Sequence, residues 1–226
     1  MIKLKSLLNE VETRKILVPR RSAEERERNK IIALIKSINS KVKKGIYEGD
    51  LDVSDLGLTS LKEFGLENVT ISGNFLCLYN KLTSLEGAPK IVRRNFHCSS
   101  NNLTSLQGAP KSVGGVFDSK LNKLTSLEGA PESVGGNFWC SSNNLTSLQG
   151  APKSVDGDFY CYNNKLTSLE GAPEIIGGMF NCSQNKLTSL EGAPKSVGGD
   201  FVCLSNKIKF TEEDVRKVSD VEGTIY

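Results

Sequence analysis

The sequence has few aromatic residues, one histidine and no long apolar run. Aromatic residues make up 7% of the 226 residues, so we expect a core built from Leu, Val, Ile and Ala. No run of about 18 apolar residues occurs, so no membrane-spanning helix and no membrane partner are expected. The net charge of +3 is too small to require a polyanionic partner. The first ten residues mix Lys3, Lys5 and Glu10 with apolar residues and lack the continuous apolar stretch of a secretion signal.

A repeat of 21 residues dominates what is present. An early copy of the string Leu-Thr-Ser-Leu begins at Leu58, and a degenerate last copy lies at Ile208. Six of the seven prolines fall in a Gly-Ala-Pro step that follows the string. A short period with fixed Pro and Gly predicts one supersecondary unit stacked on itself. Between these two copies, the string begins every 21 residues at Leu82, Leu103, Leu124, Leu145, Leu166 and Leu187.

Each unit contains a short strand followed by a turn. Phe138 and Cys140 are two residues apart, so both point inward while Trp139 points outward. Asn143 follows at the turn, where a buried amide can bond to the backbone of adjacent coils. Pro152 then holds an extended return path.

The pattern Phe138-x-Cys140-x-x-Asn143-x-Leu145 resembles the core motif of leucine-rich repeats, with Phe and Cys in two Leu places. The short unit with proline on its return side is similar to repeats of bacterial and bacteriophage proteins. The resemblance covers about residues 51–208. It implies an α/β repeat, a leucine-rich-repeat solenoid of about eight coils with short parallel strands. Two coils depart from the pattern, with Leu56 in place of the turn Asn and Ser119 in place of Cys.

Helical caps are expected at both ends of the solenoid, because an open end of the core must be covered. Ser22 and Glu25 form a capping box at the start of the first cap. Thr211 begins a short second helix, with Val215 and Val218 expected to face inward. The predicted parts are an amphipathic segment over 1–21, a helical N-terminal cap over 22–50, the solenoid over 51–209 and a C-terminal cap over 210–226.

Residues 1–10 resemble the capsid-targeting peptides of large tailed phages, which end at a protease site of the type Leu/Ile-x-Glu. Leu8, Asn9 and Glu10 fit that site. The resemblance implies a protein packaged inside a phage head and cleaved after Glu10. The alternative is a helix that docks on its neighbour, or a frayed terminus.

The cysteines all occupy one position of the repeat. Neighbours about 4.8 Å apart could form disulfides by distance alone. However, their Cβ vectors run parallel and Ser119 interrupts the column, so buried free thiols are expected. Reduced thiols without a secretion signal predict a cytoplasmic protein, in a bacterial host or inside a virion. The six are Cys77, Cys98, Cys140, Cys161, Cys182 and Cys203.

Neither metal binding nor catalysis is expected. No Cys-x-x-Cys spacing exists and His97 is the one histidine, so no zinc site is predicted. This histidine cannot pair with cysteines that face inward, and the Gly-Gly pairs never lead into a helix as a phosphate loop does. The prediction is a protein that is not an enzyme and carries no cofactor.

Function is expected where exposed positions vary from coil to coil. Exposed Trp and Tyr flanked by charges are typical of protein-binding hot spots. The alternative is a sheet surface on which aromatic cross-strand pairs add only stability. The predicted partner-binding patch, on the strand or concave face, comprises His97, Asp118, Lys120, Trp139, Tyr160, Tyr162 and Asn181.

Arg93 and Arg94 replace Gly-Gly in one coil and could form a small anion site. Nucleic acid would need a longer basic stripe, which Asp118, Asp158 and Asp200 interrupt, so nucleic-acid binding is not expected. The sequence therefore predicts a non-enzymatic module that recognises a protein partner. The alternative is a phage virion protein packaged through its N-terminal peptide, or a phage protein that acts on a host factor.

Overall fold

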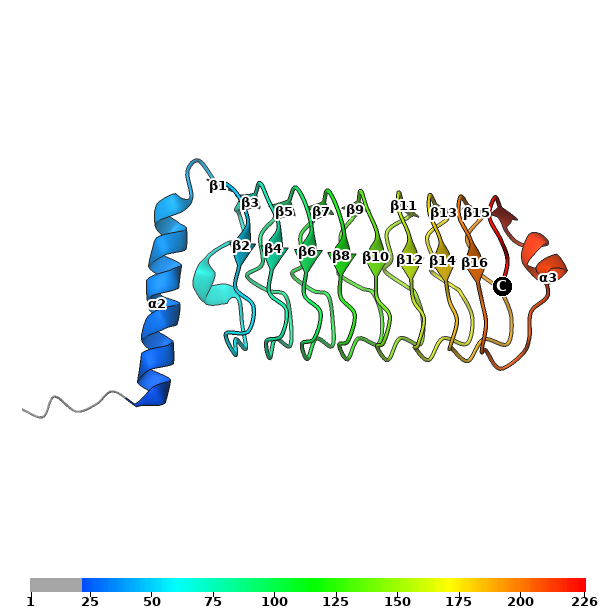
Figure 1. Cartoon of the computed structure of the whole chain (residues 1–226), viewed down its shortest axis with the longest axis horizontal. Coiled ribbons are helices and arrows are strands. Elements are labelled where there is room, and N and C mark those ends of the chain that lie inside the picture. Colours follow the sequence, from blue (N-terminus) through cyan, green and yellow to red (C-terminus); the bar gives the residue numbers. More distant parts are fainter. Residues whose placement is uncertain (1–21) are drawn as a thin grey trace, which may run out of the picture. The chain divides into compact units, whose positions relative to one another are not determined.

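The computed structural model describes residues 22–226 (Figure 1). The predicted amphipathic segment and the processing site at Leu8, Asn9 and Glu10 lie outside these residues. Contacts divide the chain into two units, residues 1–37 and residues 38–226. Over residues 22–226, no helix is long and apolar enough to cross a membrane.

Helix α2, Ala23–Lys41, begins where the sequence predicts a helix. The hydroxyl Oγ of Ser22 accepts a hydrogen bond from the backbone N of Glu25 at 3.1 Å. This bond satisfies one of the free N–H groups at the start of a helix. The helix therefore begins at the predicted cap residue.

The repeats form a solenoid of parallel strands, as predicted. Their main sheet has eight strands, and neighbours are in register: Phe138 lies opposite Phe117 on one side and Phe159 on the other (Figure 1). Each coil thus adds one strand, and a step of 21 residues keeps equivalent side chains in columns. In chain order these strands are β2 (Leu51–Asp52), β4 (Phe75–Leu76), β6 (Phe96–His97), β8 (Phe117–Asp118), β10 (Phe138–Trp139), β12 (Phe159–Tyr160), β14 (Phe180–Asn181) and β16 (Phe201–Val202).

A second strand in each coil was not predicted from the sequence. It consists of two residues between the Pro and the Gly-Gly pair, too short to show an alternating pattern. Five of these strands form one sheet, and four form another, with the interruption between β9 and β11. The first five are β1 (Ile46–Tyr47), β3 (Thr70–Ile71), β5 (Ile91–Val92), β7 (Ser112–Val113) and β9 (Ser133–Val134). The other four are β11 (Ser154–Val155), β13 (Ile175–Ile176), β15 (Ser196–Val197) and β17 (Asp220–Val221).

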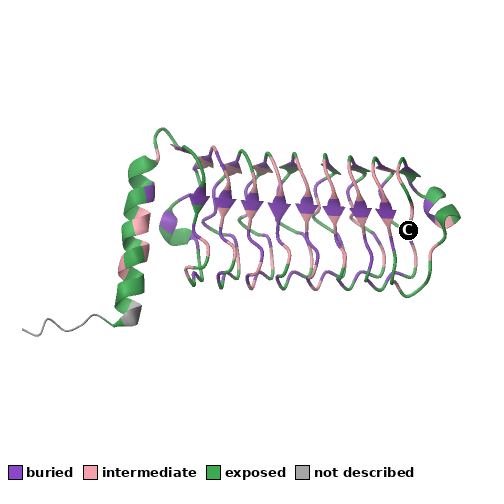
Figure 2. Ribbon diagram, viewed as in Figure 1, coloured by how far each residue is buried: buried purple, intermediate pink, exposed green. Residues whose placement is uncertain are grey.

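Stacked phenylalanines form one column of the core, so the expectation of a purely aliphatic core was wrong. Seven of the nine Phe residues occupy this column, from Phe75 to Phe201, and all seven are fully buried (Figure 2). Neighbouring ring centroids are 5.0 to 5.9 Å apart. The low overall aromatic content did not indicate an aromatic column, because the repeat places most of the few Phe residues at one position. Leu and Val columns complete the core.

The turn asparagines bond to the backbone of adjacent coils, as predicted. Asn143 donates from Nδ2 to the carbonyls of Ser119 and Cys140, both at 3.1 Å, and to that of Ser141 at 3.3 Å. Its Oδ1 accepts from the backbone N of Leu124 at 3.1 Å. These bonds satisfy buried backbone groups that no strand ladder reaches.

The six cysteines are free and buried, which confirms the prediction. The Sγ of Cys140 lies 3.4 Å from the carbonyl oxygen of Tyr160 in the next coil. Ser119, which takes the place of a cysteine, donates from Oγ to the carbonyl of Trp139 at 3.1 Å. A serine is tolerated at this position because it finds the same acceptor.

The C-terminal cap begins with helix α3, Glu212–Arg216. Thr211 and Asp214 form a reciprocal capping box at its start. Val215 is buried as expected, but Val218 is 44% exposed, so its predicted inward orientation was wrong. The chain then returns to β16, where Phe201 donates to the carbonyl of Thr224 at 2.9 Å. The end of the main sheet is therefore covered by the last residues of the chain.

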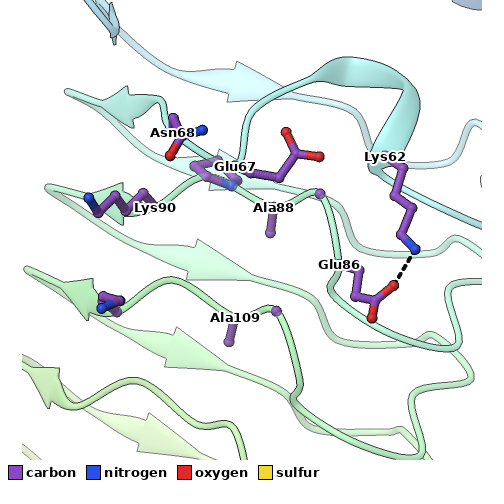
Figure 3. Close-up of a pocket in the computed structure, with 11 residues that line it drawn as sticks. Lys62, Glu67, Asn68, Glu86, Ala88, Lys90 and Ala109 are labelled. Atoms are coloured by element: carbon purple, nitrogen blue, oxygen red, sulfur yellow. Dashed lines mark ion pairs between the residues drawn. The ribbon is translucent and has the colours of Figure 1, made fainter.

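The first coil is three residues longer than the repeat of 21 and opens a hollow. The extra length contains the 3₁₀ helix η1, Lys62–Phe64, which walls a hollow of about 580 Å³ (Figure 3). Lys62 forms an ion pair with Glu86 across it, and Glu67, Lys90 and Lys111 also line it. Cationic and acidic groups are mixed there, so the hollow favours neither an anion nor a cation.

Candidate functional site

The outward side chains of the eight-stranded sheet form a surface that we call the strand face. From β4 to β16, each coil contributes three residues to it: the residue before Phe, the residue after Phe, and the residue after the Cys position. Strand β2 contributes Asp50, Asp52 and Ser54 in the same order. Column one reads Asn74, Asn95, Val116, Asn137, Asp158, Met179 and Asp200. Column two reads Leu76, His97, Asp118, Trp139, Tyr160, Asn181 and Val202. Column three reads Leu78, Ser99, Lys120, Ser141, Tyr162, Ser183 and Leu204.

An aromatic cluster occupies the middle of the strand face. The ring of Trp139 stacks on that of Tyr160, with centroids 6.3 Å apart and planes 19° apart. Lys120, from the strand on the other side, places its Nζ 4.5 Å from the centre of the Trp139 ring. Tyr162 meets Tyr160 edge to face at 6.3 Å. Trp139 is therefore held between Lys120 on one side and Tyr160 on the other.

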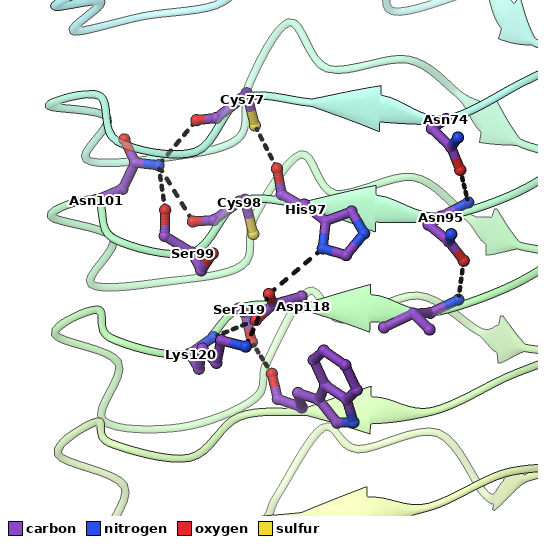
Figure 4. A network of polar contacts seen from close by, with 12 residues as sticks. Asn74, Cys77, Asn95, His97, Cys98, Ser99, Asn101, Asp118, Ser119 and Lys120 are labelled. Carbon is purple, nitrogen blue, oxygen red and sulfur yellow. Dashed lines mark hydrogen bonds and ion pairs between the residues drawn. The ribbon is translucent and has the colours of Figure 1, made fainter. Parts of the chain in front are cut away.

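Asp118 is buried, so its prediction as an exposed contact residue was wrong. Its side chain is only 4% exposed, and its Oδ2 lies 3.4 Å from both His97 Nδ1 and Lys120 Nζ (Figure 4). Its Oδ1 accepts from the backbone N of Lys120 at 3.1 Å. A buried carboxylate needs such partners to offset its lost hydration. The buried Asp118 therefore positions His97 and Lys120, which are both more exposed, from below.

Asp158 belongs to the cluster, although sequence reasoning treated it only as an interruption of basic charge. Its Oδ2 accepts from the hydroxyl of Tyr160 at 3.0 Å and from Asn137 Nδ2 at 3.2 Å. Burial, together with the bond to Asp158, raises the pKa of Tyr160 to about 12. The position of Asp158, two residues before Tyr160 on one strand, was the available signal.

Asn181 and the indole N–H of Trp139 also belong to this patch. Asn181 lies on β14, beside the strand of Tyr160, and its Oδ1 accepts from the backbone N of Ser183 at 3.1 Å. The indole Nε1 of Trp139 is enclosed and finds no hydrogen-bond partner among residues 22–226. An enclosed donor without a partner is costly, so the indole N–H offsets part of the stability that the stacked Trp139 ring contributes.

Column one forms a hydrogen-bonded ladder that is interrupted twice. Asn95 Oδ1 accepts from the backbone N of Val116 at 2.8 Å, and Asp158 Oδ1 accepts from that of Met179 at 2.8 Å. Val116 and Met179 have no side-chain acceptor, so neither can continue the ladder to the next coil. Sequence reasoning missed these two apolar residues because it compared columns for charge and aromatic character.

Arg93 and Arg94 are exposed at the turn between β5 and β6. Hydrogen bonds from Asn74 lower the pKa of Asp50, and the nearby Arg94 guanidinium lowers it further. Arg94 thus has an acidic neighbour, which weakens its attraction for a free anion.

Neither the scan against protein-family models nor the search of curated proteins found a match to this chain.

Proposed function

We propose that this chain is a non-enzymatic recognition module that binds a protein partner through the strand face. The supporting observation is the cluster of Lys120, Trp139, Tyr160 and Tyr162 in the middle of an otherwise repetitive surface. A solenoid repeats what its fold requires, and the fold does not require these side chains. Tryptophan and tyrosine are among the side chains that contribute most to the binding energy of protein interfaces.

The test is a comparison of captured proteins from bacterial lysate. The wild-type chain and the double variant Trp139→Ala/Tyr160→Ala serve as baits, and mass spectrometry identifies what each retains. We expect a partner that only the wild type retains. A matched control, Leu121→Ala/Ile175→Ala, removes two exposed apolar side chains away from the strand face. Circular dichroism checks that all three proteins are folded, and equal capture by the double variant contradicts the proposal.

A second proposal, compatible with the first, rests on Leu8, Asn9 and Glu10, which lie outside the described residues. These residues support packaging of the chain inside a phage head, or a phage protein that acts on a host factor in the bacterial cytoplasm. Intact-mass measurement of the protein recovered from virions tests it. A chain that starts at Val11 supports cleavage after Glu10, and an intact chain contradicts it.

A further inference from the structure

We infer that the partner of the strand face is a second copy of this chain. The two copies pack face to face about a two-fold axis that runs along the strands, between β10 and β12. This inference rests on the proposed function, because it names the partner of the same surface. The inference follows from which residues such an axis brings together.

The axis reverses the order of coils but keeps the direction of the strands. Each column of one copy therefore faces the same column of the other, with the coil order inverted. The strand β10 of one copy lies opposite β12 of its partner, so Trp139 faces Tyr160 of the second copy. Strand β8 lies opposite β14 in the same way.

Charge is complementary across this axis. Between β6 and β16, the two partly exposed carboxylates each lie opposite a carboxamide, and no two carboxylates face each other. The facing pairs are Asp158 with Asn137, and Asp200 with Asn95. Asn181 lies opposite Asp118, which is buried and already paired within its own chain. The Oδ1 of Asn181 is used by Ser183, while its Nδ2 makes no hydrogen bond within residues 22–226, so its N–H groups are available to a second molecule.

The two apolar interruptions of column one also meet. Val116 and Met179 break the Asn/Asp ladder, and the axis places Val116 of one copy opposite Met179 of the other. If the axis instead passed through β10, Val116 would face Asp158 and Met179 would face Asn95. That arrangement buries a carboxylate against a methyl group, which is unfavourable. The axis between β10 and β12 avoids this mismatch.

Column three alternates large and small side chains, as an interlocking surface requires. Ser99, Ser141 and Ser183 separate the larger Lys120, Tyr162 and Leu204. The axis sets each large side chain opposite a serine of the second copy, so that Tyr162 faces Ser141 and Leu204 faces Ser99. Leu204 is 52% exposed in the single chain, and the pairing covers it.

The interface is small, so the association is expected to be reversible. The six coils that face each other, at about 4.8 Å per coil and with three outward residues each, give an area of only about 400 Å² per copy. Stable dimers bury about 800 Å² per copy or more. A monomer–dimer equilibrium over tens to hundreds of micromolar is therefore expected, at about 5–6 kcal/mol.

The first measurement is sedimentation equilibrium of the full chain from about 1 to about 500 µM. We expect the weight-average mass to rise with concentration toward that of a dimer. Emission of Trp139, the one tryptophan, should shift to the blue over the same range, because the indole edge becomes covered. A chain that stays monomeric throughout overturns the inference.

Cross-linking tests the position of the axis. In Val116→Cys/Met179→Cys, the facing strands lie about 10 Å apart, the usual spacing of packed sheets, so the thiols that point into this gap are closer and within reach of a short bismaleimide. Within one copy, positions 116 and 179 are three coils apart, or about 14 Å, which is too far for this reagent. Position 116 of one copy and position 116 of the other are offset by the same three coils, as are the two positions 179, so neither single variant can be cross-linked. We expect a covalent dimer from the double variant and none from either single variant. The native cysteines give little background, because burial raises the pKa of their thiols.

Each outcome has a distinct meaning. A covalent dimer from Val116→Cys alone contradicts this axis. So does a chain that dimerises in sedimentation but whose double variant gives no covalent dimer. A monomeric chain that captures a different protein through Trp139 and Tyr160 overturns this inference and leaves the proposed function standing. A monomer that captures nothing removes both.

Discussion

Lys120 contacts Trp139 and Asp118 at the same time. Its Nζ lies 4.5 Å from the centre of the indole ring and 3.4 Å from the Oδ2 of the buried carboxylate. One cation thus faces the electron-rich ring and neutralises an acid that the sheet has enclosed. The side chains of β8 and β10 on the strand face are held together by this residue.

Replacing Lys120 by alanine should destabilise the protein by about 1–2 kcal/mol, because it removes the cation–π contact and leaves Asp118 with only His97 and the backbone N of residue 120. Denaturant unfolding followed by circular dichroism measures the change, and Trp139 emission reports the local contact. Lys123→Ala is the control, since Lys123 is exposed and lies in the next turn. Equal stability and emission in both variants would show that the contact does not form in solution.

Replacing Asn143 by alanine should lower the free energy of unfolding by about 3 kcal/mol. The change leaves the buried backbone N of Leu124 without its partner and removes one of the hydrogen bonds that each of three carbonyl groups accepts. Asn144→Ala is the matched control, because Asn144 is the next residue and only half-buried. Chemical denaturation compares the two, and a similar small loss in both would contradict the structural role of the column.

Gly150→Ala should be far more damaging than Gly57→Ala. Both glycines have positive φ, +91° and +66°, so alanine is strained by about 1 kcal/mol at either site. At Gly150 an added Cβ would also lie 2.5 Å from the backbone N of Glu128 in the previous coil, whereas nothing lies within 4 Å at Gly57. A loss of more than about 3 kcal/mol is expected for Gly150→Ala. Thermal unfolding measures both, and equal losses would mean that the coils are not in close contact there.

Stability should fall as the pH rises above about 8.5, the usual pKa of a free thiol. Burial raises the pKa of the column cysteines, so they stay protonated in the folded chain while the unfolded chain loses those protons. The contribution of these thiols to the free energy of unfolding is therefore complete below pH 8.5. Above pH 8.5 it falls by up to about 1.4 kcal/mol per pH unit for each thiol.

Unfolding curves between pH 7 and pH 10 measure this slope. Cys140→Ser should reduce it by the share of one thiol, and Ser119 shows that the position accepts serine. Cys203 is the least enclosed of the column, so it should be the first to react with a thiol reagent. A flat stability profile, or rapid modification of all six thiols in the folded protein, would contradict the burial of the column.

The period of 21 residues determined the stacked coils, the inward Phe and Cys columns and the turn asparagines. These features depend on spacing alone, because a fixed step returns the same residue to the same place in each coil. The second strand set escaped notice, since two residues such as Ser133 and Val134 carry no readable alternation. The inward orientation of the Phe side chains was predicted from the sequence, but their large share of the core was not.

Only the tertiary structure decided how the variable residues meet. The sequence placed Asp118, Lys120 and Trp139 on one face, but burial of Asp118 depends on side chains that lie 21 residues away on either strand. The same holds for Val116 and Met179, whose importance appears only when the ladder of column one is seen to stop at them. Repetition in the sequence specifies the backbone because every coil makes the same contacts. The surface is specified by differences between coils, and those act across the stack, where only the folded chain brings them together.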